Sequence, residues 1–120
     1  MSTAQLIAQW IIGLGILNVW LVRPKMATAY RGGEAKNMRE EFAVYGLPAW
    51  FMYAIGTVKV LLALALIAGT WFPPSVQPAT LAMAALMTGA VVMHIKVRDT
   101  FKKTLPSLVM LVLSIFVAMA

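Results

Sequence analysis

One lysine in this sequence lies near the middle of a long apolar stretch, where a charge is costly. The stretch runs from Leu47 to Trp71, and Lys59 is its single charged residue. An α-helix rises about 1.5 Å per residue, so roughly 20 apolar residues cross the hydrocarbon core of a membrane. Lys59 is therefore expected near the bilayer midplane, where a lysine costs roughly 2.5–3.5 kcal/mol. Such a residue is a candidate for contact with a ligand or a partner.

The surroundings of Lys59 decide what its amine can do. All four acidic residues of the chain lie between apolar stretches, so no counter-ion is expected at the level of Lys59. The amine could be uncharged, could extend toward an interface, or could donate to the polar side chains of Gln9, Thr88 or Ser114. It could also meet an acidic or quinone-like oxygen on a ligand or another subunit. Small and apolar residues share its helix face and favour a packed interior or a pocket over lipid: Met52, Gly56, Ala63 and Leu66.

A second group of candidate residues follows the third apolar stretch. His94 lies near the end of that stretch, where a hydrogen-bonding or cationic side chain suits a helix C-terminus. We expect His94 to pair with Asp99 across the turn, and the functional alternative is proton delivery to a bound quinone. Arg98 is a further candidate in the same turn. The chain has no cysteine and one histidine, so we expect no metal site and assign no catalytic residue.

Four helices must position these residues. The chain has 120 residues, of which 62% are hydrophobic, which is more apolar surface than a soluble domain of this size could bury. The sequence therefore predicts an all-α polytopic membrane protein that consists of a single membrane domain over residues 1–120. Its four transmembrane helices form one bundle, and they are expected at about residues 5–22, 47–71, 78–95 and 105–120.

The basic residues predict how the bundle is oriented. Almost all of them lie in residues 23–46 and 96–104, whereas the connection between the second and third helices and both tails have none. By the positive-inside rule, both basic loops face the cytoplasm and both termini lie outside, in a bacterial cytoplasmic membrane. This rule also explains the net charge of +6, so we expect lipid rather than nucleic acid as the partner surface.

The first basic loop is long enough to hold a helix of its own. Met38, Phe42 and Tyr45 recur on one stripe, and Gly46 and Pro48 follow as stop signals. We expect a short amphipathic cytoplasmic helix that covers the bundle or docks a partner or lipid headgroup. Aromatic residues are expected at the two membrane interfaces: Trp20, Tyr45, Trp50 and Tyr53 on the inner side, and Trp10, Trp71 and Phe72 on the outer side.

Three motifs together resemble the DoxX-like family of small four-helix membrane proteins. They are YGLPAW at 45–50, AIGTVKVLLALALIAG at 54–69 and VMHIKVRDTFKKTLPSL at 92–108. The resemblance implies a four-helix fold, and it implies activities that range from subunits of quinone-linked oxidoreductases to maturation factors and chaperones. Family members commonly have a glutamate where this chain has Lys59, and redox-active relatives in the wider four-helix group use cysteines that this chain lacks.

These observations predict an accessory, partner-binding membrane subunit without catalysis of its own. Another membrane protein, or a second copy of the chain, is the expected partner. The alternative is a quinone-binding subunit of an oxidoreductase, in which Lys59 or His94 hydrogen-bonds a quinone oxygen. Transport is a third class. Cation efflux is disfavoured because small multidrug transporters use a carboxylate within the membrane and this chain has none there, while anion transport past Lys59 stays open.

Overall fold

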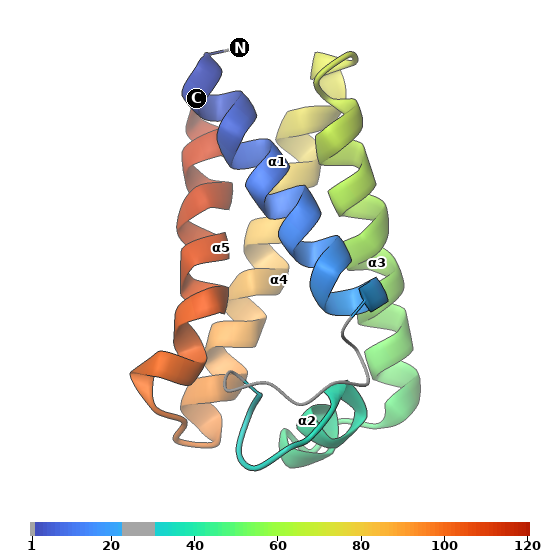
Figure 1. Ribbon diagram of the computed structural model, residues 1–120, viewed down its shortest axis with the longest axis vertical. Helices are drawn as coiled ribbons and strands as arrows, with labels where there is room; N and C mark the ends of the chain where they lie inside the picture. The colour runs from blue at the N-terminus through green and yellow to red at the C-terminus, as the bar shows by residue number, and fades with distance from the viewer. Residues whose placement is uncertain (1, 23–30) are drawn as a thin grey trace.

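Four long helices and one short helix make up the protein in a computed structural model, which describes residues 2–22 and 31–120 (Figure 1). Each long helical segment is long and apolar enough to cross a membrane. The chain is therefore all-α with four candidate spans, as the sequence predicts. In chain order the elements are α1 (Thr3–Leu17), a π-helical turn η1 (Asn18–Val22), α2 (Met38–Val44), α3 (Ala49–Ala68), a 3₁₀ turn η2 (Pro73–Ser75), α4 (Val76–Lys96) and α5 (Phe101–Met119).

The two ends of the bundle differ in composition. Both termini and η2 lie at one end, which we call the terminal end (Figure 1). The opposite end contains α2 and the α4–α5 turn, and we call it the basic end. Every described basic residue except Lys59 belongs to the segments at this end: Arg31, Lys36, Arg39, Lys96, Arg98, Lys102 and Lys103. Arg23 and Lys25, which also entered the orientation argument, lie outside the described residues.

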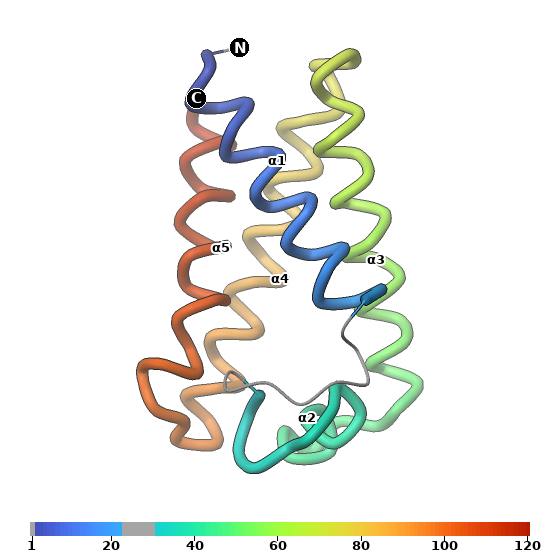
Figure 2. Tube along the Cα trace, viewed as in Figure 1, coloured from blue at the N-terminus to red at the C-terminus, as the bar shows by residue number. Residues whose placement is uncertain are grey.

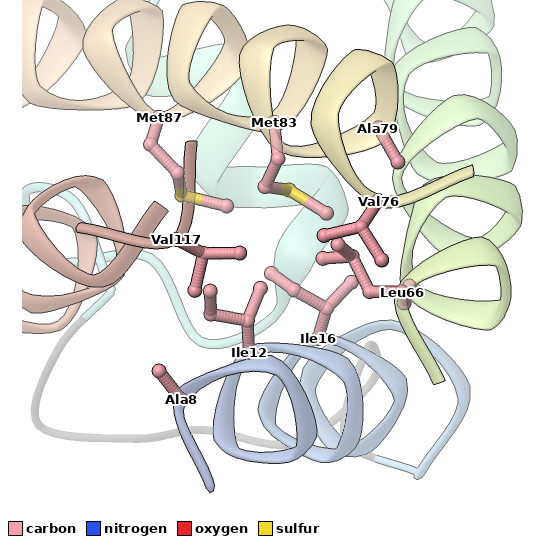
Figure 3. Packing of buried hydrophobic residues seen from close by; sticks show 10 residues of the cluster. Ala8, Ile12, Ile16, Leu66, Val76, Ala79, Met83, Met87 and Val117 are labelled. Atoms are coloured by element: carbon pink, nitrogen blue, oxygen red, sulfur yellow. The ribbon is translucent and has the colours of Figure 1, made fainter. Parts of the chain in front are cut away.

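The course of α1 divides the bundle into a packed half and a hollow half. This helix runs obliquely, beside α5 near the terminal end and beside α3 toward the basic end (Figure 2). Near the terminal end all four long helices meet in one core, in which Ile12 faces Met83 and Val117 (Figure 3). The other buried members of this core are Ala8, Ile16, Ala63, Leu66, Val76, Ala79 and Met87.

Two helix ends near the basic end close with the same hydrogen-bonding pattern. After α2, the Leu47 amide donates to the Phe42 carbonyl and Gly46 adopts a φ of 81°. After α4, the Asp99 amide donates to the His94 carbonyl at 3.0 Å, and Arg98 takes the left-handed position with a φ of 57°. Both are Schellman motifs, which reverse the chain tightly. The second one returns Asp99 to the level of His94.

Candidate functional site

A cavity of about 670 Å³ lies in the half of the bundle nearest the basic end. Its walls come from the end of α1, from η1, α2 and the first half of α3, and from the facing parts of α4 and α5. Most of the wall is apolar, with Ile16, Phe51, Ile55 and Met110 among the lining residues. A cavity of this size and character falls in the range of small-molecule sites, roughly 300–1,000 Å³.

Lys59 contributes the amine that projects into this cavity from α3. The residue is only 8% exposed, and its helix face is buried together with Met52, Gly56, Ala63 and Leu66, as the sequence predicts. Within residues 2–22 and 31–120, no hydrogen bond or ion pair to the Lys59 amine is found. The amine lies 5.4 Å from the centroid of the Trp20 ring, which places a cation over an aromatic face.

Trp20 reaches Lys59 because two local features permit it. Trp20 belongs to the π-helical turn η1, and such turns recur at functional sites. Its ring packs against α3 at Gly56, where a Cβ atom would approach the ring to 2.5 Å. The missing side chain at Gly56 leaves room for the half-buried Trp20 ring against α3, while its predicted place at the inner membrane interface stays a prediction.

The short helix α2 brings an acid and a phenol to the same cavity. Asn37 caps its first turn by accepting from the Glu40 amide at 2.8 Å. Met38, Phe42 and Tyr45 are buried, and so is Glu41 at 8% exposure. The helix covers the basic end of the bundle (Figure 1) and directs both Glu41 and Tyr45 into the cavity wall.

Glu41 is the acceptor for three donors. Arg31 forms an ion pair with Glu41 Oε2 at 3.1 Å, the Gly32 amide donates to Oε1 at 3.1 Å, and the Tyr45 hydroxyl donates to Oε1 at 2.7 Å. Glu41 and Lys59 line the same cavity, from α2 and α3.

His94 continues this network toward the α4–α5 turn. Its Nε2 lies 3.2 Å from the Tyr45 hydroxyl, and its Nδ1 lies 2.7 Å from Asp99 Oδ2. The predicted pairing of His94 with Asp99 is thus present. Asp99 Oδ1 accepts from the Gly33 amide at 2.9 Å, so the loop before α2 and the α4–α5 turn are tied together. Lys103 adds a further tie by donating to the Gly33 carbonyl.

Burial governs the protonation of Tyr45. Burial and the neighbouring Glu41 carboxylate raise the pKa of the Tyr45 phenol well above its ordinary value of 10.0. The phenol therefore stays neutral and donates its proton to Glu41. Lys96 fixes the same residue from the other side by donating to the Tyr45 carbonyl at 3.0 Å.

Three predicted neighbours of Lys59 donate their hydrogen bonds elsewhere. Gln9 donates to the Leu66 carbonyl at 3.2 Å, nearly two turns closer to the terminal end than Lys59. Thr88 is exposed and donates to the Ala84 carbonyl, while Ser114 donates to the Met110 carbonyl. Of the alternatives open for the Lys59 amine, a polar core with these three side chains is not seen in the structure. Arg98 is exposed on the turn, and its contribution is to the backbone geometry.

Sequence reasoning missed Arg31, Glu41 and Tyr45 as members of the site, and one signal could have found Glu41. This acid lies three residues after Met38 and four before Tyr45, so it falls on the apolar stripe of α2. A charged residue on a buried stripe requires a partner. No comparable pattern marks Arg31, whose position depends on the fold of the loop.

The arrangement suits a ligand that is apolar with one polar, hydrogen-bond-accepting end. The apolar walls accommodate the body of such a molecule, and the Lys59 amine is available to its oxygen. Among the described residues there is no cluster of three or more histidine, cysteine, aspartate or glutamate residues that could hold a metal ion. These side chains can bind such a ligand by a hydrogen bond to its oxygen and by contact with aromatic rings.

Comparison with known proteins identifies a family. A sequence model described as the DoxX-like family matches residues 16–117, which include all of α2, α3 and α4. This match confirms the resemblance drawn from the three motifs. No curated protein and no solved structure matches the chain.

Proposed function

This chain belongs to the DoxX-like family, and on that premise we propose that it is a membrane subunit that holds a quinone-like molecule for a partner protein. The quinone head occupies the cavity, and one of its carbonyl oxygens accepts a hydrogen bond from Lys59. The redox partner, and not this chain, supplies the electrons. The accessory role and quinone binding are thus two parts of one function.

The unpaired amine of Lys59 is the observation that carries the proposal. Lys59 is only 8% exposed, and its amine, which borders the cavity, has no hydrogen bond among the described residues; proteins retain such groups where a ligand completes them. The amine faces a cavity whose wall is mostly apolar, so the completing molecule must enter from lipid with an oxygen at its polar end. Quinones have this chemistry, and the Trp20 ring beside the amine offers a face for stacking.

The need for a partner follows from what the chain can supply. Reduction of a quinone requires two electrons, and dithiols are the redox groups that a protein can build from its own side chains. The sequence has no cysteine. A second protein that brings a flavin, haem or iron–sulfur group is therefore part of the proposal. We place the basic end at the cytoplasmic face of a bacterial inner membrane, where the positive-inside rule puts it.

Purification in native lipid, followed by mass spectrometry of proteins and small molecules, tests both parts. We expect about one quinone per chain in the wild-type particles, and a large reduction in Lys59→Met particles. A co-purifying redox protein would support the accessory role. Wild-type particles without quinone would contradict the binding half, and turnover by the isolated chain would contradict the accessory half.

A further inference from the structure

A continuous line of hydrogen bonds joins the α4–α5 turn to the cavity. It runs from Asp99 to His94, then to the Tyr45 hydroxyl, and ends at Glu41 in the cavity wall, with heavy-atom distances of 2.7, 3.2 and 2.7 Å. The His94 and Asp99 side chains are 5% and 4% exposed. The line is therefore mostly shielded from water, and protons enter it only through the small exposed part of these two side chains at the basic end.

The number of protons in this line can be counted from its donors and acceptors. Glu41 receives donors from Arg31 and from the Gly32 amide, which fits a carboxylate, so the single Tyr45 proton points to Glu41. The Tyr45 oxygen is then free to accept from His94 Nε2. His94 Nδ1 faces the Asp99 carboxylate, which is also an acceptor. A proton on each ring nitrogen satisfies both of these contacts.

We propose that the line Asp99–His94–Tyr45–Glu41 is a proton relay that moves one proton from His94 into the cavity. In the second arrangement the Tyr45 hydroxyl has passed its proton to Glu41 and has taken the Nε2 proton of His94. His94 is then neutral and accepts from Tyr45, while Glu41 is a neutral acid beside Lys59. Tyr45 has one proton in both arrangements, and the line keeps the same number of hydrogen bonds.

The relay rests on the proposed function for its purpose. When a quinone held by Lys59 receives two electrons from the flavin, haem or iron–sulfur group of a partner, its reduced oxygen takes a proton. The Glu41 O–H bond breaks and the quinone O–H bond forms, and His94 regains its proton from water at the basic end before a second transfer. Glu41 is the group that touches the ligand, and Tyr45 and His94 act through it.

Several charged groups from other elements surround His94 and set the charge balance of the relay. Glu41 and Asp99 are carboxylates: Glu41 pairs with Arg31, and Asp99 faces His94. Three lysines lie near the line: Lys96 donates to the Tyr45 carbonyl, Lys103 donates to the Gly33 carbonyl, and Lys59 lines the cavity.

Nitrogen-15 NMR of histidine-labelled protein in nanodiscs tests the resting arrangement without any ligand. His94 is the single histidine of the chain, so a tag without histidine leaves one pair of ring resonances. Near neutral pH we expect the imidazolium signature in the wild type and in Glu40→Gln, a matched control whose acid lies outside the line. Tyr45→Phe removes the acceptor of the Nε2 proton and shifts His94 toward the neutral Nδ1–H form. A neutral His94 in the wild type, or an unchanged imidazolium in Tyr45→Phe, would overturn the relay.

Proton uptake during reduction of bound decylubiquinone by dithionite tests the delivery step. At saturating decylubiquinone we expect Tyr45→Phe to form quinol roughly 10- to 100-fold more slowly than the wild type, with Glu40→Gln at the wild-type rate. Equal quinol formation in Tyr45→Phe would overturn delivery through the relay. A wild type that does not bind decylubiquinone would instead contradict the proposed function, and the NMR result would still decide the relay.

Discussion

At the scale of single residues, Lys59 makes the ligand-free protein less stable but leaves an amine available to a ligand. A lysine near the middle of a membrane helix costs roughly 2.5–3.5 kcal/mol, and its contact with a desolvated tryptophan returns about 2 kcal/mol at most. We therefore predict that Lys59→Met raises the stability of the ligand-free protein by about 1 kcal/mol. Thermal unfolding in detergent measures this, with Val58→Met on the exposed face of α3 as control. A lower melting temperature in Lys59→Met would contradict it.

Tyr45 gives the protein a specific dependence on alkaline pH. Its pKa is higher in the folded chain than the ordinary value of 10.0, so folding holds the phenol proton more tightly. The corresponding stabilisation is complete below about pH 10 and is lost as the pH rises above that value. We predict that the melting temperature of the wild type falls more steeply above about pH 10 than that of Tyr45→Phe.

The exposed Tyr53 provides the control for this comparison, because Tyr53→Phe should keep the wild-type slope. Parallel curves for the wild type and Tyr45→Phe would show that Tyr45 is not the responsible group.

Lys59 and Tyr45 show what could and could not be predicted from the sequence. The buried face of Lys59 could be read from helical periodicity, whereas the bridge from Tyr45 to His94 joins residues 49 positions apart and depends on how α2 docks.

At the scale of elements, the α4–α5 turn carries a strained position that can be relieved. Arg98 occupies the left-handed site of a Schellman motif, where glycine has no steric cost. We predict that Arg98→Gly stabilises the protein by roughly 0.5–1 kcal/mol and leaves the His94–Asp99 contact in place. Chemical or thermal unfolding checks the first part, and the histidine NMR spectrum checks the second.

Lys102→Gly is a matched control for that substitution, because it places glycine inside the first turn of α5 and should destabilise it. If both variants lost stability alike, the strain at Arg98 would not be real.

The long helices themselves were predictable, because about 20 apolar residues in a row admit few other structures in lipid. The burial of Glu41 is indicated by its place on the apolar stripe of α2, but that place does not reveal its partner.

At the scale of the whole molecule, the two ends of the bundle should lie on opposite sides of the membrane. The chain has no cysteine, so single cysteines can be introduced without removing any. We predict that a membrane-impermeant maleimide labels Pro74→Cys in intact cells and labels Lys102→Cys only after the membrane is broken. Both positions are exposed in the structure. The reverse labelling pattern would invert the proposed orientation.

The hollow half of the bundle is a property that only the assembled helices have. Gly13 and Gly15 let α1 approach its neighbours closely, since a Cβ at either position would press on Ile67 or Met110. Helical periodicity indicates which faces are buried, but it does not fix the angle at which α1 crosses the bundle. That angle separates α1 from α5 toward the basic end and so makes room for a ligand next to Lys59.

The central claim is that the Lys59 amine binds the polar oxygen of a quinone-like ligand, and an equilibrium titration tests it most directly. Decylubiquinone is titrated into wild-type, Lys59→Met and Val58→Met protein in nanodiscs of the same lipid, after thermal unfolding has shown that all three are folded. Loss of a hydrogen bond from a charged donor costs about 1.5–3 kcal/mol. We predict that Lys59→Met binds roughly 10- to 100-fold more weakly while Val58→Met binds like the wild type. Equal affinity in Lys59→Met and the wild type would contradict the account.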